Sequence, residues 1–502
     1  MTQVENVVLV TVDSLRSDAI GYGAADSDTP VIDDVADGGA TFEHAFANGN
    51  WTPFSFPSIL SSSPVFASDG DIGVRSTETI AETLQAEGIH TAGFNAANGF
   101  LTEHWGYDSG FDEFEANVST SRLKPYSQYL AAHPTVQGWL QLASSPFRRA
   151  VNRLHPGKDH SQPIANTSKL REVEQRAVSF IEDAGDDPFF LWIHYMDTHT
   201  PYVPAPRHLR EVSSDRVGTP RMFKAHARTG LGLEVGPSLL ADLRTLYDAT
   251  VRQVDASVGR VRETLEATGV ADETALFVAG DHGEEFQEHG HLAHYPKLYD
   301  ELVHVPFVVD VPGAPARDVD GHVGLDAIPP TICDLLGVAS PTSWRGRSLA
   351  NVLRDGEPAP DDPVVSVAVR GESVTQQPIP RQLSDGELLV SARTRDWTYI
   401  RHTESGHEEL YHRPSDPTQQ VDVLAGAADD AERDGGPPDG TGDPLAVPAD
   451  GGAGPADEQA PLDELRTVVQ SHAASLDDTG GDEDTGAVDD ELATRLSALG
   501  YR

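Results

Sequence analysis

Residues 7–18 read VVLVTVDSLRSD, a run of six apolar or β-branched residues that ends at an aspartate. A continuous run of this kind is typical of a central parallel strand that is covered on both faces. Asp13 follows at the carboxyl end of the predicted strand, which is the edge where open α/β sheets bind their ligands. A carboxylate at this place suits a hard cation, although Asp13 alone could equally cap the turn that follows.

Further apolar runs recur along the chain, so that predicted strands alternate with predicted helices. Apolar runs predict further strands at 91–94, 189–195, 275–280 and 305–309, and amphipathic periodicity predicts helices at 77–87 and 239–268. This alternation predicts an α/β fold with a central, mostly parallel sheet and helices on both faces. We expect this domain to span residues 1–352.

The chain changes character at residues 355–363, DGEPAPDDP. Three short strands are predicted after this loop, at 364–369, 388–393 and 397–402, which indicates a small C-terminal antiparallel α+β unit over residues 364–424. Residues 425–461 are rich in Gly, Pro, Asp and Ala and predict a disordered acidic linker, because they offer too little apolar surface to bury. An acidic tail with short helices, at 462–474 and 489–499, is expected over residues 462–502.

The charge of the chain limits its partners. Eighty acidic and 36 basic residues give a formal net charge of −44. An acidic excess spread along the whole chain predicts a halophilic protein, because the Debye length falls to about 3 Å at 1 M salt and self-repulsion is screened. This charge argues against nucleic acids and anionic membranes as general partners, because both are polyanionic. An anionic substrate would need a local positive site.

Compartment signals are few. Cys333 is the single cysteine, so no intrachain disulfide can form. The first residues lack a basic region, and no stretch approaches the roughly 18 apolar residues of a membrane helix. The sequence predicts a cytoplasmic protein without a membrane span.

A second group of polar residues follows the predicted strand at 275–280. Residues 280–285 read GDHGEE and are followed by EHGH at 288–291 and by His294. A carboxylate and an imidazole at the end of a buried strand, here Asp281 and His282, suit a divalent ion. The flanking glycines permit the tight turns that this placement needs.

Two further segments carry candidate reactive groups. Residues 51–58, WTPFSFPS, place hydroxyl groups between prolines and could set a nucleophile at the N-terminus of a helix. Turn chemistry explains the same residues equally well. Residues 196–202, MDTHTPY, follow the strand predicted at 189–195, and His199 could bind an anion or protonate a leaving group.

Taken together and in this order, these segments resemble the sulfatase family of the alkaline-phosphatase superfamily, from Val7 to about Leu349. The resemblance implies one divalent metal ion, Ca, Mg or Mn with Zn less favoured, which would be bound by Asp13, Thr52, Asp281 and His282. It implies that Thr52 is the nucleophile and that His199 and His294 assist catalysis. The groups expected to contact the substrate are Arg16, Ser55, His199 and Lys297.

The chain departs from the family pattern at three positions. Thr52 replaces the cysteine or serine that typical sulfatases convert to formylglycine, so that aldehyde cannot form by the usual route. Phe56 stands at the usual arginine position, and Ser14 replaces the second acid of the usual pair. Ser55 remains a reserve nucleophile.

The implied function is hydrolysis of sulfate esters by a sulfuric ester hydrolase, with a small-molecule or glycan ester as substrate. The threonine leaves phosphate esters open, as a phosphodiesterase, a phosphonate esterase or a phosphoglycerol-type phosphotransferase. A third alternative is a non-catalytic protein that keeps the fold as a binding module, which would hold no metal.

Overall fold

The structure is a computed structural model. It describes residues 3–22, 28–68, 70–96, 98–116, 169–185, 187–214, 217–218, 220–221, 224–225, 228, 235–371, 380–425 and 455–477. Most of the predicted linker and the helix predicted at 489–499 lie outside the described residues.

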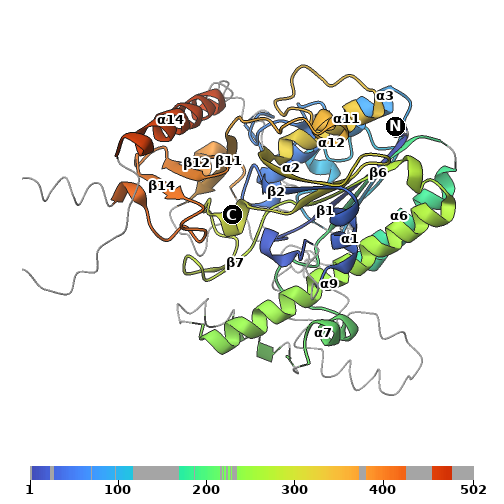
Figure 1. The fold of residues 1–502 in the computed structure, drawn as a ribbon, viewed down its shortest axis with the longest axis horizontal. Helices are drawn as coiled ribbons and strands as arrows, with labels where there is room; N and C mark the ends of the chain where they lie inside the picture. Colours follow the sequence, from blue (N-terminus) through green and yellow to red (C-terminus); the bar gives the residue numbers. More distant parts are fainter. Residues whose placement is uncertain are drawn as a thin grey trace, which may run out of the picture.

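An eight-stranded sheet forms the centre of the molecule (Figure 1). Its middle strand, β1 (Asn6–Val12), pairs in parallel with β5 (Phe189–Tyr195) on one side and with β6 (Thr274–Gly280) on the other. The remaining strands are β2 (Ala40–Phe46), β3 (His90–Asn95), β4 (Glu113–Glu115), β9 (Phe307–Asp310) and β10 (Arg317–Gly324), in the sheet order β10-β2-β9-β6-β1-β5-β3-β4. Only β9 runs antiparallel to its neighbours, which confirms the predicted, mostly parallel sheet.

Helices cover both faces of this sheet (Figure 1). One face carries α2 (Thr52–Ser61), α3 (Ile80–Ala86), α11 (Ile328–Leu336) and α12 (Ala350–Asp355), and the other carries α1 (Pro30–Gly38), α6 (Leu170–Ala184) and α9 (Pro237–Thr268). The side chains of β1 alternate between the two cores: Val7 and Leu9 join one, while Val8 and Val10 join the other. Burial on both faces explains why β1 is apolar at nearly every position. A short helix, α7 (Pro206–Val212), contacts α9.

The helix predicted at 77–87 begins later because of its N-cap. The Thr79 hydroxyl accepts a hydrogen bond from the backbone of Glu82, and the Glu82 carboxylate accepts one from the backbone of Thr79. This capping box starts α3 at Ile80. The long helix predicted at 239–268 is confirmed as α9.

A separate antiparallel sheet confirms the predicted small unit. It contains β11 (Val364–Arg370), β12 (Glu387–Arg393), β13 (Trp397–His402) and β14 (Glu408–His412), in that order. The helix α14 (Pro455–Asp477) packs on this sheet (Figure 1). Because α14 begins at Pro455, residues 455–461 are helical and not part of a disordered linker, which corrects that prediction. Leu465 and Val469 supply the apolar surface that orders the helix.

A buried ion-pair network ties the small sheet to the main domain. Asp300, in α10 (Asp300–Val303), accepts hydrogen bonds from Arg413 Nε at 2.7 Å and from Gln419 Nε2 at 2.9 Å. Arg393 Nε lies 3.5 Å from the same carboxylate, and its side chain is fully buried. Burial alone would raise the pKa of Asp300, but Arg413 and Arg393 hold the pKa below its ordinary value.

Replacing Asp300 with alanine is expected to destabilise the protein by about 3–5 kcal/mol, because two buried guanidinium groups lose their counter-charge. Urea unfolding measures this loss. Asp320 and Arg395 form the matched surface pair, with side chains 67% and 54% exposed, and Asp320→Ala should cost less than about 1 kcal/mol. Equal losses in the two variants would contradict the assignment.

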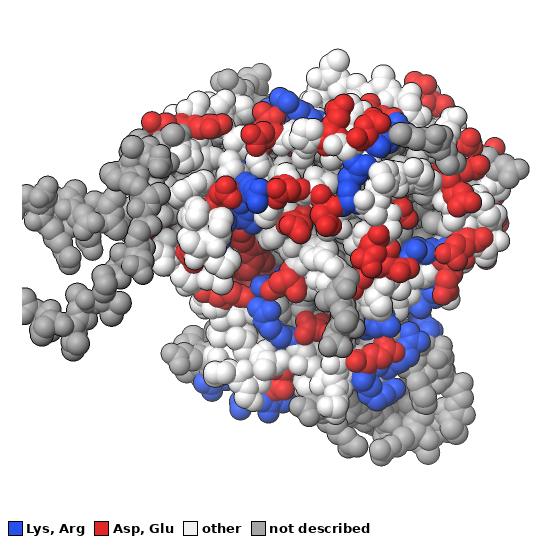
Figure 2. All heavy atoms as spheres, viewed as in Figure 1, with Lys and Arg blue, Asp and Glu red and all other residues white. Residues whose placement is uncertain are grey.

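Acidic side chains are spread over the face drawn in Figure 2 and do not gather in one patch. One of the partly buried acids is Asp248 in α9. Burial and the nearby carboxylate of Asp28 raise the pKa of Asp248 to about 7, against the pull of Arg244. Salt adaptation itself stays a prediction.

The Asp248→Asn variant is expected to gain stability as the pH rises. When folding raises the pKa of a carboxyl group, the group does not destabilise the fold at a pH below its unfolded pKa, near 4. Its destabilising effect grows as the pH rises from there and levels off above the pKa of the folded state. The gain should therefore be small at pH 5 and reach about 1–4 kcal/mol at pH 8, measured by calorimetry. Asp37→Asn, which removes the same charge from an exposed position, is the control. A gain that does not change with pH would contradict this prediction.

Among the described residues, no helix combines the length and the apolar composition that crossing a membrane requires.

Candidate active site

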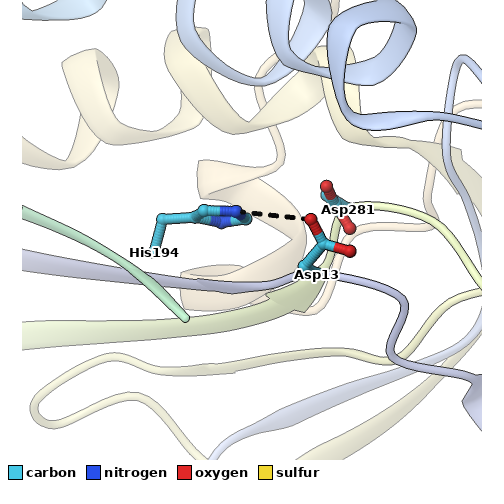
Figure 3. Close-up of side chains that lie close together, drawn as sticks. All are labelled: Asp13, His194 and Asp281. Carbon is cyan, nitrogen blue, oxygen red and sulfur yellow. Dashed lines mark ion pairs between the residues drawn. The ribbon is translucent and has the colours of Figure 1, made fainter. Parts of the chain in front are cut away.

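The ends of the three central strands bring three polar side chains together (Figure 3). Asp13 follows β1, His194 is the penultimate residue of β5, and Asp281 follows β6. All three are fully buried, and each offers one ligand atom within 4.8 Å of the others. The predicted position of Asp13 and Asp281 at the carboxyl edge of one sheet thus places them side by side.

The Asp13 carboxylate is held by hydrogen bonds from three elements. Its Oδ1 accepts from Ser14 Oγ at 2.9 Å. Its Oδ2 accepts from Thr52 Oγ1 at 3.0 Å and from Asn98 Nδ2 at 3.2 Å. Burial would raise the pKa of Asp13, but three facing imidazoles hold the pKa below its ordinary value, those of His199, His194 and His282. Asp13 is therefore an ionised carboxylate with a fixed orientation.

Oδ1 of Asp281 is held by two backbone hydrogen bonds. It accepts from the backbone nitrogens of Ser14 at 3.1 Å and His282 at 2.8 Å. Ser14 itself has a φ of +56°, in the left-handed region. Burial and the negative charge of Asp13 raise the pKa of Asp281 well above its ordinary value. Two buried carboxylates at this separation create a strong demand for positive charge.

Thr52 is the first residue of α2, as the sequence suggested for a nucleophile. Trp51 is the extended N-cap, and Pro53 favours the helical start that follows. The Thr52 hydroxyl lies 3.4 Å from His282 Nε2, in addition to its hydrogen bond to Asp13. His282 Nδ1 lies 2.8 Å from the Gly283 carbonyl, an acceptor, so Nδ1 carries the hydrogen and Nε2 faces Thr52 with a lone pair.

Gly283 is required by close packing beside His282. A Cβ at this position would lie 2.1 Å from the Glu301 carbonyl oxygen. Any larger residue would therefore push the 281–284 turn, and with it Asp281 and His282, away from the sheet. The glycine that the sequence pattern singled out has a packing role.

Three imidazoles line the approach to Thr52. The ring centroids of His282 and His294 are 4.8 Å apart, and those of His294 and His199 are 5.0 Å apart. His199 Nδ1 donates to the Thr200 carbonyl at 2.6 Å, and His294 Nδ1 lies 3.2 Å from the carboxylate of Glu284. His199 and His294 are half-buried, so they lie between the closed cluster and solvent.

Glu284 positions His294 through its carboxylate. Tyr202 Oη donates to Oε1 of Glu284 at 2.8 Å, while His294 binds Oε2. Burial would raise the pKa of Glu284, but His294, His199 and Tyr202 hold the pKa below its ordinary value. The loop that carries His294 is also tied to α2, because Trp51 Nε1 donates to the His294 carbonyl at 2.5 Å.

Three predicted substrate contacts are engaged elsewhere in the protein. Arg16 donates to Asp18 at 2.7 Å and to Glu288 at 2.9 Å. Lys297 pairs with the buried Glu285 at 2.9 Å. The Ser55 hydroxyl donates to the Asp281 carbonyl at 2.6 Å, which supports the 281–284 turn and takes up its one hydrogen. The structure thus brings Thr52, His199 and His294 together with the Asp13–Asp281 pair, and gives Arg16, Ser55 and Lys297 other partners.

Sequence reasoning missed two residues of the cluster, His194 and Asn98. His194 lies in a strand, FFLWIHY, in which it is the one strongly polar side chain. That polar residue near the carboxyl end of a buried strand was a usable signal. Asn98 carried no signal, because its contact with Asp13 spans 85 residues of chain.

The residues of this cluster fit a divalent cation. Asp281 Oδ2 and His194 Nε2 are buried and have no hydrogen-bond partner within the described chain. Buried polar atoms almost always have a partner, so two such atoms beside an ionised carboxylate mark a place for a cation. His282 Nε2 lies 3.8 Å from both Asp13 Oδ1 and Asp281 Oδ1 and adds an imidazole donor.

This chain shares sequence and fold with known enzymes. A family model described as Sulfatase matches residues 5–338. A multifunctional alkaline phosphatase superfamily protein of Trinickia caryophylli is 25% identical over 269 residues, which cover 46% of this chain and 52%, about half, of that protein. An ulvan-active sulfatase of Formosa agariphila is 22% identical over 438 residues, which cover 84% of this chain and 77% of that protein. The crystal structure of a phosphonate monoester hydrolase of Agrobacterium radiobacter has a TM-score of 0.64 at 19% identity, covering 92% of this chain and 96% of that one.

Proposed function

Because this chain belongs to the sulfatase family, we propose that it is a metal-dependent hydrolase of sulfate esters with Thr52 as its nucleophile. The match across residues 5–338 includes every residue of the candidate site and confirms the resemblance read from the sequence. The named sulfatase relative, which aligns with 84% of this chain, supports sulfate as the group that is transferred.

The position of the Thr52 hydroxyl carries this proposal. Thr52 Oγ1 lies 3.0 Å from Asp13 Oδ2 and 3.4 Å from His282 Nε2, at the start of a ten-residue helix. A hydroxyl group is a weak nucleophile until a neighbouring base or ion removes its proton. Thr52 is flanked by a carboxylate and by an imidazole lone pair, and both can serve this purpose.

Asp13, Asp281, His282 and Thr52 would hold the cation. When bound, a divalent cation lowers the pKa of a nearby hydroxyl group and neutralises charge on the group that is transferred. The overall charge of −44 makes such a local positive centre necessary for binding any anion.

The reaction divides into two steps at Thr52. In the first step, the hydroxyl proton of Thr52 passes to Asp13 Oδ2 as Thr52 Oγ1 forms a bond to sulfur. The bond from sulfur to the ester oxygen breaks, and the departing oxygen takes a proton from an imidazole. In the second step, water attacks the sulfur of the covalent sulfothreonine and gives a proton to the imidazole that lost one in the first step. The bond from sulfur to Thr52 Oγ1 breaks, Oγ1 takes its proton back from Asp13, and sulfate leaves.

In this proposal, His294 and His199 transfer protons to and from the substrate. Glu284 holds the His294 ring through Nδ1, so its Nε2 is the atom left for a proton at the leaving group. His199 is held through Nδ1 by the Thr200 carbonyl, which likewise leaves Nε2 for the substrate. General acid–base groups of this kind contribute about 10²–10⁴-fold to a rate.

The threonine favours a second candidate, hydrolysis of phosphonate esters or of phosphate diesters. Typical sulfatases act through a formylglycine that Thr52 cannot become. A phosphonate monoester hydrolase shares this fold. Phosphoryl transfer by Thr52 would use the same two steps, with phosphorus in place of sulfur.

Two esters with one leaving group separate these candidates. The rates kcat/KM for 4-nitrophenyl sulfate and for the mono-4-nitrophenyl ester of phenylphosphonate should be measured with the same full-length, metal-loaded enzyme. Sulfate-ester hydrolysis predicts the larger value for the sulfate. A larger value for the phosphonate would replace the first candidate with the second, and no turnover of either ester would support the non-catalytic alternative.

A further inference from the structure

We propose that His194 is a further ligand of the cation and that it shifts the preference of the site from Ca²⁺ or Mg²⁺ toward Mn²⁺ or Zn²⁺. This inference rests on the proposed metal-dependent function. It adds a residue outside the expected ligand set of Asp13, Thr52, Asp281 and His282.

The first observation is the unpartnered nitrogen of His194. The imidazole is fully buried, and Nε2 has no hydrogen-bond partner in the described part of the protein. This atom points at the Asp13 carboxylate and lies 3.8 Å from Oδ2 (Figure 3). A buried polar atom without a partner costs about 1–3 kcal/mol, and a cation between His194 and Asp13 would remove this cost.

The second observation is the hydrogen-bond chain that orients the ring. Thr11 Oγ1 lies 3.3 Å from the Ile193 carbonyl, 3.0 Å from Trp192 Nε1 and 3.0 Å from His194 Nδ1. A hydroxyl group has one hydrogen and two lone pairs, and the indole can only donate. If the Thr11 hydrogen binds the Ile193 carbonyl, Thr11 accepts from both Trp192 and His194, and every group is satisfied.

With that assignment, the hydrogen of His194 lies on Nδ1 and Nε2 keeps a lone pair for a ligand. Metal-binding histidines have this arrangement, in which the second ring nitrogen donates to a fixed acceptor. His282 repeats it, with Nδ1 bound to the Gly283 carbonyl. The Asp13 carboxylate therefore lies between two imidazoles, each 3.8 Å away and each with Nε2 toward it.

Phe56 packs against the ring of His194 and adds no charge beside it. Its ring packs edge-on against His194, with centroids 4.9 Å apart and planes at 86°, and also contacts Trp192 at 5.5 Å. Phe56 stands where the family pattern has arginine. An arginine here would bring a permanent charge against the imidazole, whereas phenylalanine encloses the ring without competing for Asp13.

The donor set decides the preferred ion. Ca²⁺ and Mg²⁺ take oxygen ligands almost entirely, while imidazole suits Zn²⁺ and other transition ions. With one imidazole the site would be mainly oxygen. A second imidazole gives two nitrogens beside two carboxylates, which favours a transition ion and revises the expectation that zinc is less favoured.

Metal titration of the full-length apoprotein tests this assignment without reference to activity. Calorimetry should give Kd values for Zn²⁺, Mn²⁺ and Ca²⁺ in the wild type, in His194→Ala and in His194→Gln. His322→Gln is the control, because His322 on β10 is also buried and its Nε2 has no hydrogen-bond partner among the described residues. We expect His194→Ala to weaken Zn²⁺ and Mn²⁺ by more than about 100-fold, which exceeds the loss typical of residues that only support a ligand.

The binding of Ca²⁺ should change only a few-fold in His194→Ala, so the selectivity for Zn²⁺ over Ca²⁺ should narrow. Nitrogen couplings in the pulsed EPR spectrum of bound Mn²⁺ should fall from two imidazoles to one. Thr11→Val, which keeps His194 but removes the acceptor of Nδ1, should weaken Zn²⁺ by about 10–100-fold.

Unchanged Zn²⁺ affinity in both His194 variants, with the EPR couplings intact, would overturn the assignment while leaving the metal site itself in place. An equal loss for Ca²⁺ and Zn²⁺ would overturn it as well, because it would make His194 a positioning residue for Asp13. A wild-type protein that binds none of the three ions would overturn this inference together with the proposed function.

Discussion

Replacing Thr52 with alanine is expected to lower kcat on the preferred ester by on the order of 10⁴-fold or more, since the covalent step loses its nucleophile. The side chain is small and sits at the first position of α2, so the fold should remain intact. Initial rates over a wide range of enzyme concentration measure the loss. Circular dichroism and the Tm establish that the variant is folded.

Thr52→Ser is the matched control, because it keeps a hydroxyl group at the same position. We expect this variant to retain activity within about tenfold of the wild type, a small loss on the scale of nucleophile removal. Mass spectrometry of a quenched reaction should find the sulfo or phosphoryl group on the peptide that contains Thr52. Full activity in Thr52→Ala, or an adduct on Ser55, would contradict the assignment.

Removal of the metal is expected to produce the second largest effect. Dialysis against a chelator should abolish turnover and lower the Tm by several degrees, because a ligand present at about 1,000 times its Kd stabilises the folded state by about 4 kcal/mol. Adding back a divalent ion should restore both. Activity and a Tm that do not change on treatment with the chelator would contradict the proposed metal dependence.

The Asp281→Asn variant separates metal binding from general damage. The substitution removes one of two buried carboxylates that repel each other, so the apoprotein should gain stability. The rise in Tm on adding metal should disappear at the same time, because a ligand is lost. A variant that is destabilised without metal would show that Asp281 has another structural role.

The sequence was sufficient for the central strands and for two of the cluster's acids. The strands β1, β5 and β6 are largely apolar runs, because burial on both faces leaves little room for polar side chains, and their limits were predicted within about one residue. Asp13 and Asp281 directly follow two of these runs. Parallel strands end at one edge of a sheet, so their proximity followed from local pattern alone.

Strands at the other side of the sheet were harder to predict. β10 (RDVDGHVG) is polar at several positions and has an irregular register with β2. It lies at the edge of the sheet, where one side needs no pairing and exposed side chains are tolerated. Its identity as a strand depends on its partner, not on its own residues.

What the sequence alone determined was the chemistry available at the end of each strand: a hydroxyl at a helix start, two carboxylates and several imidazoles in a strongly acidic chain. Only the tertiary structure decided which positively charged side chains are available to bind a substrate. Arg16 and Lys297 looked suited to an anionic substrate, but folding brings Glu288 and Glu285 against them and neutralises them. His194 lies within the run predicted as a strand at 189–195, and the register of β5 beside β1 aims its Nε2 at Asp13. Both outcomes depend on contacts between residues that are not neighbours in the chain. A pattern of residues along the sequence does not give the distances between such residues in the folded protein.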